Sequence, residues 1–209
     1  MELAPRYGVG GADLSSTTDL TCATILFKKT YDGVLYVLQM YWLPESTMER
    51  MTEKEQKIYS AWIEQGYMRL SAGSRVQYSD VTAWFLEMQQ AIGLNILWCG
   101  YDSWSANYWV QEMAQYFGQS AMESVIQGKK TLSAPMKNMG ADLTAKRINY
   151  NNNPILKWCL TNTAVDIDRN GNIQPLKSNQ RRRIDGTASL LDAYVALERH
   201  LDDYNNLTL

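Results

Sequence analysis

Three aspartates stand at the ends of apolar segments, and their type and placement could support chemistry. Asp13 closes a Gly-rich apolar stretch, Asp102 ends the most hydrophobic run, and Asp185 begins a long amphipathic segment. A carboxylate carried into an apolar interior is costly unless it is paired or binds a metal. If the three converge at one end of a sheet, their oxygens could hold two hard divalent cations. Such a pair of ions, roughly 3.5–4 Å apart, would support phosphodiester cleavage.

Capping of helices is the competing explanation for these residues. Asp is a favoured helix N-cap, and this alone accounts for either Asp102 or Asp185 taken singly. Asp13 is harder to explain in this way, because the Ser-Ser-Thr sequence that follows it already supplies turn chemistry. Asp192 lies two helical turns beyond Asp185 on the same face and is a rival or fourth ligand. Its neighbours leave room for a plain surface role, which we favour.

Other motifs fail on inspection. The sequence GVGGAD begins like a dinucleotide fingerprint, but Asp13 occupies the third glycine position and would repel a pyrophosphate. The GKKT sequence from Gly128 lacks the preceding glycine of a phosphate-binding loop. The calcium-like spacing from Asp166 has Lys177 where a bidentate Glu is required. His200 is the single histidine and is expected as a charge at a helix C-terminus. Carboxylates therefore remain the plausible chemistry.

Composition describes one ordinary globular domain with an uneven charge. The 209 residues are enough for one well-buried core, and the net charge is −2. Residues 128–183 nevertheless contain 11 basic and 3 acidic residues, which fits either a polyanion-binding surface or a solvated basic face. The three cysteines are far apart and form no CxxC pair, which argues against a zinc site or a disulfide framework. No apolar run approaches the roughly 18–20 residues of a membrane span, and no secretory signal is recognisable, so we expect an intracellular protein.

The hydrophobic patterns predict an α/β fold. Three strands come first, and Asp32-Gly33 marks a hairpin turn between the second and the third. A type I′ turn is expected at Asn170-Gly171, in a later hairpin. The expected strands are residues 7–14, 19–29, 34–43, 96–101 and 122–127; the expected helices are 52–66, 79–93, 104–117, 132–147, 154–160 and 184–201; the later hairpin is 165–177. The pattern predicts a mixed sheet, an antiparallel three-strand meander followed by parallel strands, flanked by helices.

Several segments together resemble the nuclease domain of the tailed-phage terminase large subunit. The segments are GGADLSSTTDLTCATILF, WIEQGYMRLSAGSRVQYSDV, GYDSWSA and RRRIDGTASLLDAYVALER. Each is short, but their order and spacing are specific, and the similarity runs over residues 7–199. The resemblance implies a ribonuclease-H-like fold and an endonuclease that cuts concatemeric double-stranded phage DNA during packaging. It also implies two Mg²⁺ or Mn²⁺ ions, with Asp13, Asp102 and Asp185 as metal ligands and catalytic residues.

The remaining expectations follow from this resemblance. Basic residues after the hairpin should contact DNA phosphates; they are Lys177, Arg181, Arg182 and Arg183. We expect residues 1–209 to be a single nuclease domain without the packaging ATPase, an isolated C-terminal domain rather than the product of a split gene. Expected partners are double-stranded DNA and, in the full-length protein, the packaging ATPase domain, the small terminase subunit and the portal, with no membrane. The expected location is the host cytoplasm.

Two alternatives stay open at this point. One keeps the fold but changes the substrate, to that of a Holliday-junction resolvase or a transposase-like nuclease. The other is not an enzyme: a DNA-binding or motor-docking module whose aspartates only cap helices.

Overall fold

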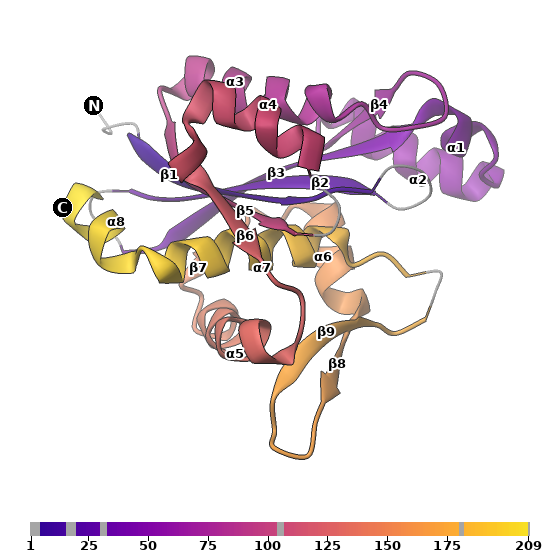
Figure 1. Ribbon diagram of the computed structural model, residues 1–209. Helices are drawn as coiled ribbons and strands as arrows, with labels where there is room; N and C mark the ends of the chain where they lie inside the picture. The colour runs from indigo at the N-terminus through magenta and orange to yellow at the C-terminus, as the bar shows by residue number, and fades with distance from the viewer. Residues whose placement is uncertain (1–4, 16–19, 30–32, 104–106, 180–181, 209) are drawn as a thin grey trace.

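A mixed sheet lies between two layers of helices (Figure 1). The computed structural model describes residues 5–15, 20–29, 33–103, 107–179 and 182–208. The sheet strands are β1 (Tyr7–Asp13), β2 (Thr21–Lys28), β3 (Leu35–Pro44), β4 (Met68–Ser71), β5 (Asn95–Asp102), β6 (Met122–Val125) and β7 (Ile148–Asn149). The helices are α1 (Glu45–Glu49), α2 (Glu53–Glu64), α3 (Tyr78–Ile92), α4 (Asn107–Phe117), α5 (Lys129–Thr144), α6 (Pro154–Asn162), α7 (Asp185–Arg199) and α8 (Leu201–Thr208). A separate hairpin of β8 (Thr163–Ile167) and β9 (Ile173–Lys177) projects from one face.

The strand order confirms the predicted topology. The order is β4-β3-β2-β1-β5-β6, with β7 also paired to β3. Strands β1, β2 and β3 form the antiparallel meander, and β5 and β6 continue it in parallel. The carboxyl ends of β1 and β5 therefore lie side by side. In the described part of the chain, no helix is both long and apolar enough to span a membrane.

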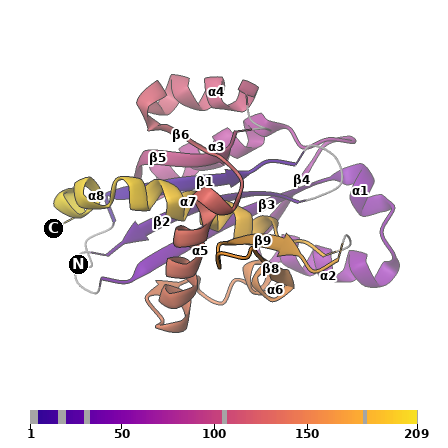
Figure 2. The same cartoon turned by 60° about the horizontal axis from the view of Figure 1, so that its bottom comes forward.

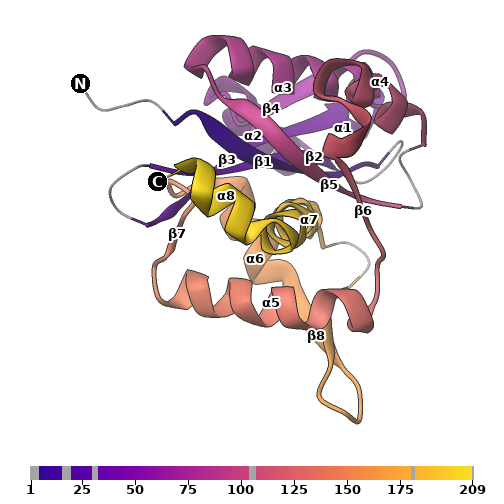
Figure 3. The same ribbon diagram turned by 60° about the vertical axis from the view of Figure 1, so that its left-hand side comes forward.

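Each face of the sheet is closed by its own apolar layer. Helices α3 and α4 cover one face, where Trp84 meets Trp42 of β3 edge to face at 6.1 Å between ring centroids. Helix α7 runs across the other face, with α5 beyond it (Figure 3). There Leu190 and Leu191 pack with residues of β1 and β2 such as Val9 and Leu26. Seen from the α7 side, that helix crosses directly over the central strands (Figure 2).

Helix α7 rests directly on the backbone of the two central parallel strands. Gly11 of β1 and Gly100 of β5 are register partners. A Cβ atom on Gly11 would collide with the backbone of Ser189 and Ala193, and one on Gly100 would collide with the carbonyl of Asp192. Absence of side chains at these two positions therefore sets the distance between the helix and the sheet.

Local signals in the sequence agree with the structure in most places. Thr52 and Glu55 form the expected capping box at the start of α2, and Gly93 ends α3 with φ of 69°. The later hairpin is present, but the type I′ prediction is wrong. A type I′ turn needs positive φ at both central residues, whereas Gly171 alone has it in this turn, with φ of 75°. The carboxylate of Asp168 accepts backbone N–H bonds inside the loop and favours this wider turn instead.

Gly100→Ala should destabilise the protein because the new methyl group meets backbone rather than a movable side chain. Overpacking of this kind costs about 1–3 kcal/mol in the free energy of unfolding. Urea denaturation monitored by tryptophan fluorescence measures the loss. Gly140→Ala is the matched control, since Gly140 lies in α5 with open space around its would-be Cβ. Removing a helical glycine should raise stability by up to about 1 kcal/mol. Equal effects of the two substitutions would contradict the packing argument.

Candidate metal centre

The sequence Gly-x-Asp occurs at the carboxyl ends of two neighbouring parallel strands. It appears as GAD ending at Asp13 in β1 and as GYD ending at Asp102 in β5, with the two glycines in register. Strand side chains alternate between faces, so each aspartate projects on the face that its glycine opens to α7. The repeat therefore places Asp13 and Asp102 side by side beneath that helix.

Helix α7 contributes two further carboxylates. Asp185 in its first turn is 3% exposed, and Asp192 two turns later is 2% exposed. Ser189 lies between them on the same face, against the carbonyl of Gly11. The surface role that the sequence favoured for Asp192 is therefore wrong: its backbone carbonyl faces Gly100, and this contact carries its side chain inward.

Helix capping does not describe Asp185 or Asp102. The N-cap residue of α7 is Ile184, and Asp185 is already the first helical residue. Asp102 belongs to β5, where it pairs with Val125 of β6, and α4 begins at Asn107.

The four carboxylates share one electrostatic environment. The pKa of Asp13 is raised well above 3.8, first by burial and then by the charges of Asp185, Asp192 and Asp102. The charge of Lys177 at the end of β9 lowers the same pKa, but its effect is the smallest of the five. Burial and the three neighbouring carboxylates together therefore outweigh Lys177 in their effect on the pKa of Asp13.

Asp192 is held by a partner that the sequence did not reveal. Gln127 donates from Nε2 to its Oδ1 at 3.1 Å and, from the same nitrogen, to the carbonyl of Val125 at 3.4 Å. Burial raises the pKa of Asp192 well above 3.8, and the charge of Asp102 raises it further, whereas Gln127 and Arg199 lower it. Gln127 follows β6 closely, so this bond ties the sheet edge to the middle of α7.

A buried polar network fixes the beginning of α7. Ser189 Oγ lies 2.7 Å from Thr24 Oγ1 of β2. Gln39 of β3 donates from Nε2 to Thr24 Oγ1 and to the carbonyl of Gly186, both at 2.8 Å. Gly186 directly follows Asp185, so the network positions that carboxylate relative to three strands. Buried polar networks of this kind rigidify a site when their members are bonded.

The chemistry of the donors fits hard cations. Cys22, Cys99 and Cys159 are buried free thiols, and burial raises the pKa of Cys159 to about 12. Protonated thiols are poor metal ligands, which leaves carboxylate oxygens of the type that Mg²⁺ and Mn²⁺ prefer. As they now stand, no group of three or more His, Cys, Asp or Glu side chains among the described residues could hold a metal ion.

The basic residues expected to contact DNA separate into different places. Lys177 lies beside the carboxylates, close enough for its charge to act on Asp13. Arg182 is exposed and donates to Asn162 Oδ1 at 3.0 Å. Arg183 is half-buried and lines an aromatic pocket with Tyr59. Arg181 lies outside the described residues.

Sequence reasoning missed Asp192 as a buried member of the cluster and missed Gln127 entirely. The repeated Gly-x-Asp was a signal that could have linked β1 to β5, because its two copies end neighbouring strands. Nothing local distinguishes Gln127, since its partner lies 65 positions away in the chain.

The chain is similar in sequence and in structure to the large subunits of phage terminases. The HK97 phage terminase large subunit is 29% identical over 188 residues, which cover 89% of this chain and 36% of that protein. The chain thus spans about a third of the length of that relative. The crystal structure of the HK97 large terminase matches with a TM-score of 0.80 at 27% identity, over 93% of this chain and 40% of that one.

Structures of separate nuclease domains match the fold as well. The large terminase nuclease of thermophilic phage G20c with bound magnesium has a TM-score of 0.56 at 15% identity, over 90% of this chain and 80% of that one. The nuclease domain of the bacteriophage SPP1 large terminase, with bound Mn, has a TM-score of 0.50 at 10% identity, over 92% and 86%. The family model of the terminase large subunit endonuclease domain matches residues 2–200. With its mixed sheet and its carboxylates gathered under α7, this chain belongs to the terminase large subunit endonuclease domain family.

Proposed function

We propose that this chain is a divalent-metal-dependent endonuclease that hydrolyses phosphodiester bonds of double-stranded DNA, cutting concatemeric phage DNA during packaging. The observation that carries the proposal is the concentration of four carboxylates at one end of the central strands, three of which act together on the pKa of Asp13 against a smaller effect of Lys177. A folded protein keeps such an arrangement at a cost in stability, and bound cations offset that cost.

In this proposal Asp13, Asp102 and Asp185 are the metal ligands and catalytic residues. Asp192 joins them as a fourth carboxylate, oriented by Gln127. Two Mg²⁺ or Mn²⁺ ions bound there supply activation of a water molecule and stabilisation of the leaving oxygen. The support for these metals is the oxygen-only donor set, together with the magnesium and Mn found in the G20c and SPP1 nucleases.

The residues around the carboxylates bind and orient the DNA. In this proposal Lys177, whose charge acts on Asp13, and the exposed Arg182 contact DNA phosphates. The start of α7 keeps Asp185 in place through the bond of Gln39 to Gly186. In a full-length protein, the packaging ATPase domain, the small terminase subunit and the portal would be the partners of this domain.

Asp13→Asn should abolish cleavage of supercoiled plasmid in Mn²⁺ while leaving the fold intact, because the amide keeps the shape but cannot bind the cation as a carboxylate does. Loss of groups that only support metal ligands costs about 10–100-fold, so loss of a ligand should cost at least about 100-fold in rate. Asp203→Asn is the matched control, since Asp203 is an exposed aspartate on α8. Unchanged cleavage by Asp13→Asn would sink the proposal and leave the non-enzymatic module as the better explanation.

A cleavage assay with two other substrates distinguishes a packaging nuclease from a Holliday-junction resolvase. A linear duplex and a four-way junction of the same sequence are offered to the wild-type chain in Mn²⁺. The packaging nuclease should cut the linear duplex at least as well as the junction. Strong preference for the junction would instead favour a resolvase.

Without divalent ions, the stability of the wild-type protein should carry a penalty that grows as the pH rises. The folded pKa of Asp13 is raised, so the unfolded chain releases its proton first as the pH passes the ordinary value of 3.8. Stability from this group is therefore complete below that pH and is lost as the pH rises through the folded pKa. Asp13→Asn removes the penalty, so its advantage over wild type in urea denaturation should be small near pH 4 and larger near pH 7.

Addition of Mn²⁺ should then reverse the order at neutral pH, because binding to the folded wild type stabilises it by mass action. Asp203→Asn should follow the wild type throughout. An advantage of Asp13→Asn that does not change with pH, or a wild type indifferent to Mn²⁺, would contradict the placement of a cation among these carboxylates.

A further inference from the structure

An aromatic pocket lies between α2 and α6, beside the beginning of α7. Its cavity is about 300 Å³. Tyr59 and Trp62 of α2 have ring centroids 4.9 Å apart, and Trp62 lies 5.5 Å from Trp158 of α6. Arg183 places a guanidinium in the same lining. With Met51, Glu55 and Ile58, the three aromatic rings and the guanidinium line a space at the lower end of the roughly 300–1,000 Å³ typical of small-ligand sites.

The pocket is adjacent to the metal centre. Arg183 lines the pocket, and Asp185 follows it by two residues. Trp158 packs against the same apolar cluster as Cys159 and Tyr41, which lie beneath the start of α7. Burial raises the pKa of Tyr59, while Arg183 lowers it by charge and by a side-chain hydrogen bond; the charge of Asp185 reaches the same hydroxyl. The charge of Asp185 thus acts on a residue of the pocket lining, which places the pocket next to the beginning of the carboxylate cluster.

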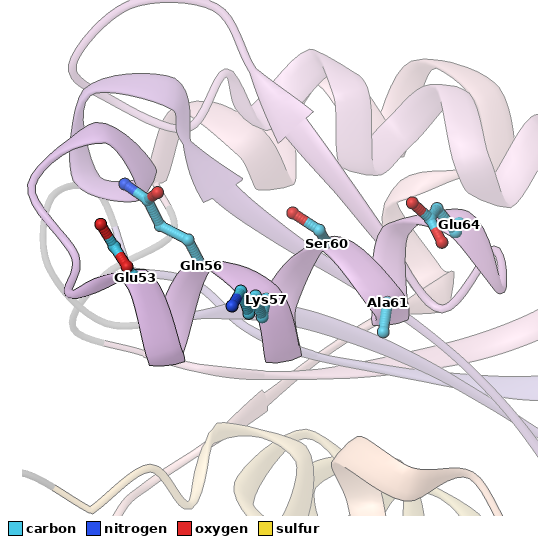
Figure 4. A pocket seen from close by; sticks show the side chains of 6 residues that line it. All are labelled: Glu53, Gln56, Lys57, Ser60, Ala61 and Glu64. Atoms are coloured by element: carbon cyan, nitrogen blue, oxygen red, sulfur yellow. The ribbon is translucent and has the colours of Figure 1, made fainter.

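The opposite face of the same helix provides a contrast. A shallow hollow there is lined by Glu53, Gln56, Lys57, Ser60, Ala61 and Glu64, whose side chains are spread along α2 (Figure 4). It has no aromatic ring, and its two acidic side chains would repel a phosphate. Helix α2 therefore presents a polar outer face and an aromatic inner face, and the inner one is the face directed toward α6 and Arg183.

We propose that the pocket formed by Tyr59, Trp62, Trp158 and Arg183 binds one unstacked nucleobase of the DNA strand that enters the metal centre. Aromatic rings stack on any base and so bind without sequence preference. A guanidinium can stack on the base or pair with the adjoining phosphate. The inference rests on the proposed DNA substrate and adds a binding site to it.

Charge and size favour a nucleobase over a segment of protein. Arg183 gives the lining a positive charge, and a nucleotide brings a phosphate that complements this charge, whereas an apolar protein segment brings none. The rim residue Glu55 is already engaged, because its Oε2 accepts from the Thr52 hydroxyl at 2.6 Å and the Thr52 N–H at 2.9 Å. Recognition therefore falls to stacking and to Arg183 and not to base-edge readout.

Photocrosslinking tests the site in the unaltered protein. A short single-stranded DNA carrying 5-iodo-2′-deoxyuridine is bound in EDTA, irradiated with near-ultraviolet light, and the attached peptide is identified by mass spectrometry. Attachment at Tyr59, Trp62 or Trp158 is the expected result. Attachment confined to other aromatic residues would overturn the inference and leave the pocket as a surface for protein contacts.

Affinity measurements supply the second test. Fluorescence anisotropy with a labelled single strand should show Trp158→Leu binding on the order of 5- to 100-fold more weakly, the effect of losing one stacked base. Trp158→Phe should recover most of the affinity because it restores a ring. Lys57→Ala, on the outer face of α2, should bind nearly as the wild type does. Equal weakening by leucine and phenylalanine would indicate a packing defect and would overturn stacking as the cause.

The two proposals fail in different ways. Cleavage lost in Asp13→Asn, with crosslinks elsewhere and full affinity in Trp158→Leu, would reject the pocket and keep the nuclease. Crosslinks in the pocket with no metal-dependent cleavage by the wild type would reject the nuclease and keep the pocket. Asp13→Asn itself should retain affinity for the single strand in EDTA, since it leaves the pocket unchanged.

Discussion

The contact between α7 and the bare backbone of two glycines is the constraint on which the rest of the structure depends. Gly11 and Gly100 are partners in neighbouring parallel strands, and helix backbone occupies the space where their side chains would be. Two residues after its glycine, each strand has an aspartate, Asp13 or Asp102, on the face that is turned toward the same helix. Because the helix is so close, carboxylates from the strands and from α7 enter one shared environment. A larger residue at either glycine would move the helix and with it half of the cluster.

That geometry forces like charges together, and the surroundings compensate them only in part. Lys177 and Arg199 act on single members of the cluster, and Gln127 satisfies one oxygen of Asp192. Thr24, Ser189 and Gln39 are bonded to one another and to the backbone of Gly11 and Gly186. This network fixes the start of α7 against the sheet, and the carboxylates project from that fixed frame. This is the division expected when a rigid frame positions ligands for a cation.

The sequence predicted what short-range patterns determine. Alternating strands, the capping box at Thr52 and the glycine end of α3 come from residues a few positions apart, and each is present. The short strands β4, with four residues, and β7, with two, were not predicted, because segments this short become strands only through pairing with β3. The burial of Asp192 was not predicted for a related reason. Its flanking residues are compatible with either an exposed or a buried helix face, and the contact of its carbonyl with Gly100 turns this face toward the sheet. Asp13 and Asp102 were predicted only as the ends of separate strands. The repeated Gly-x-Asp indicates that the two ends are related, but their adjacency follows from the pairing of β1 with β5, which brings together residues about 90 positions apart.

The uneven charge along the chain corresponds to the two helical layers of the fold. The net charge of −2 conceals a basic stretch, residues 128–183, which supplies α5, α6 and the β8–β9 hairpin. All three lie on the α7 side of the sheet, whereas α3 and α4 on the other side come from the acidic first part (Figure 1). Some of the basic residues pair locally, as Lys129 does with Asp166 at 2.8 Å, but the segment contains 11 basic and only 3 acidic residues. In the proposed function, a DNA strand attracted to this basic stretch meets the carboxylates on the same side of the sheet. Cations bound between its phosphate and the aspartates would offset the repulsion between the two, which would join the basic layer and the acidic cluster in a single site.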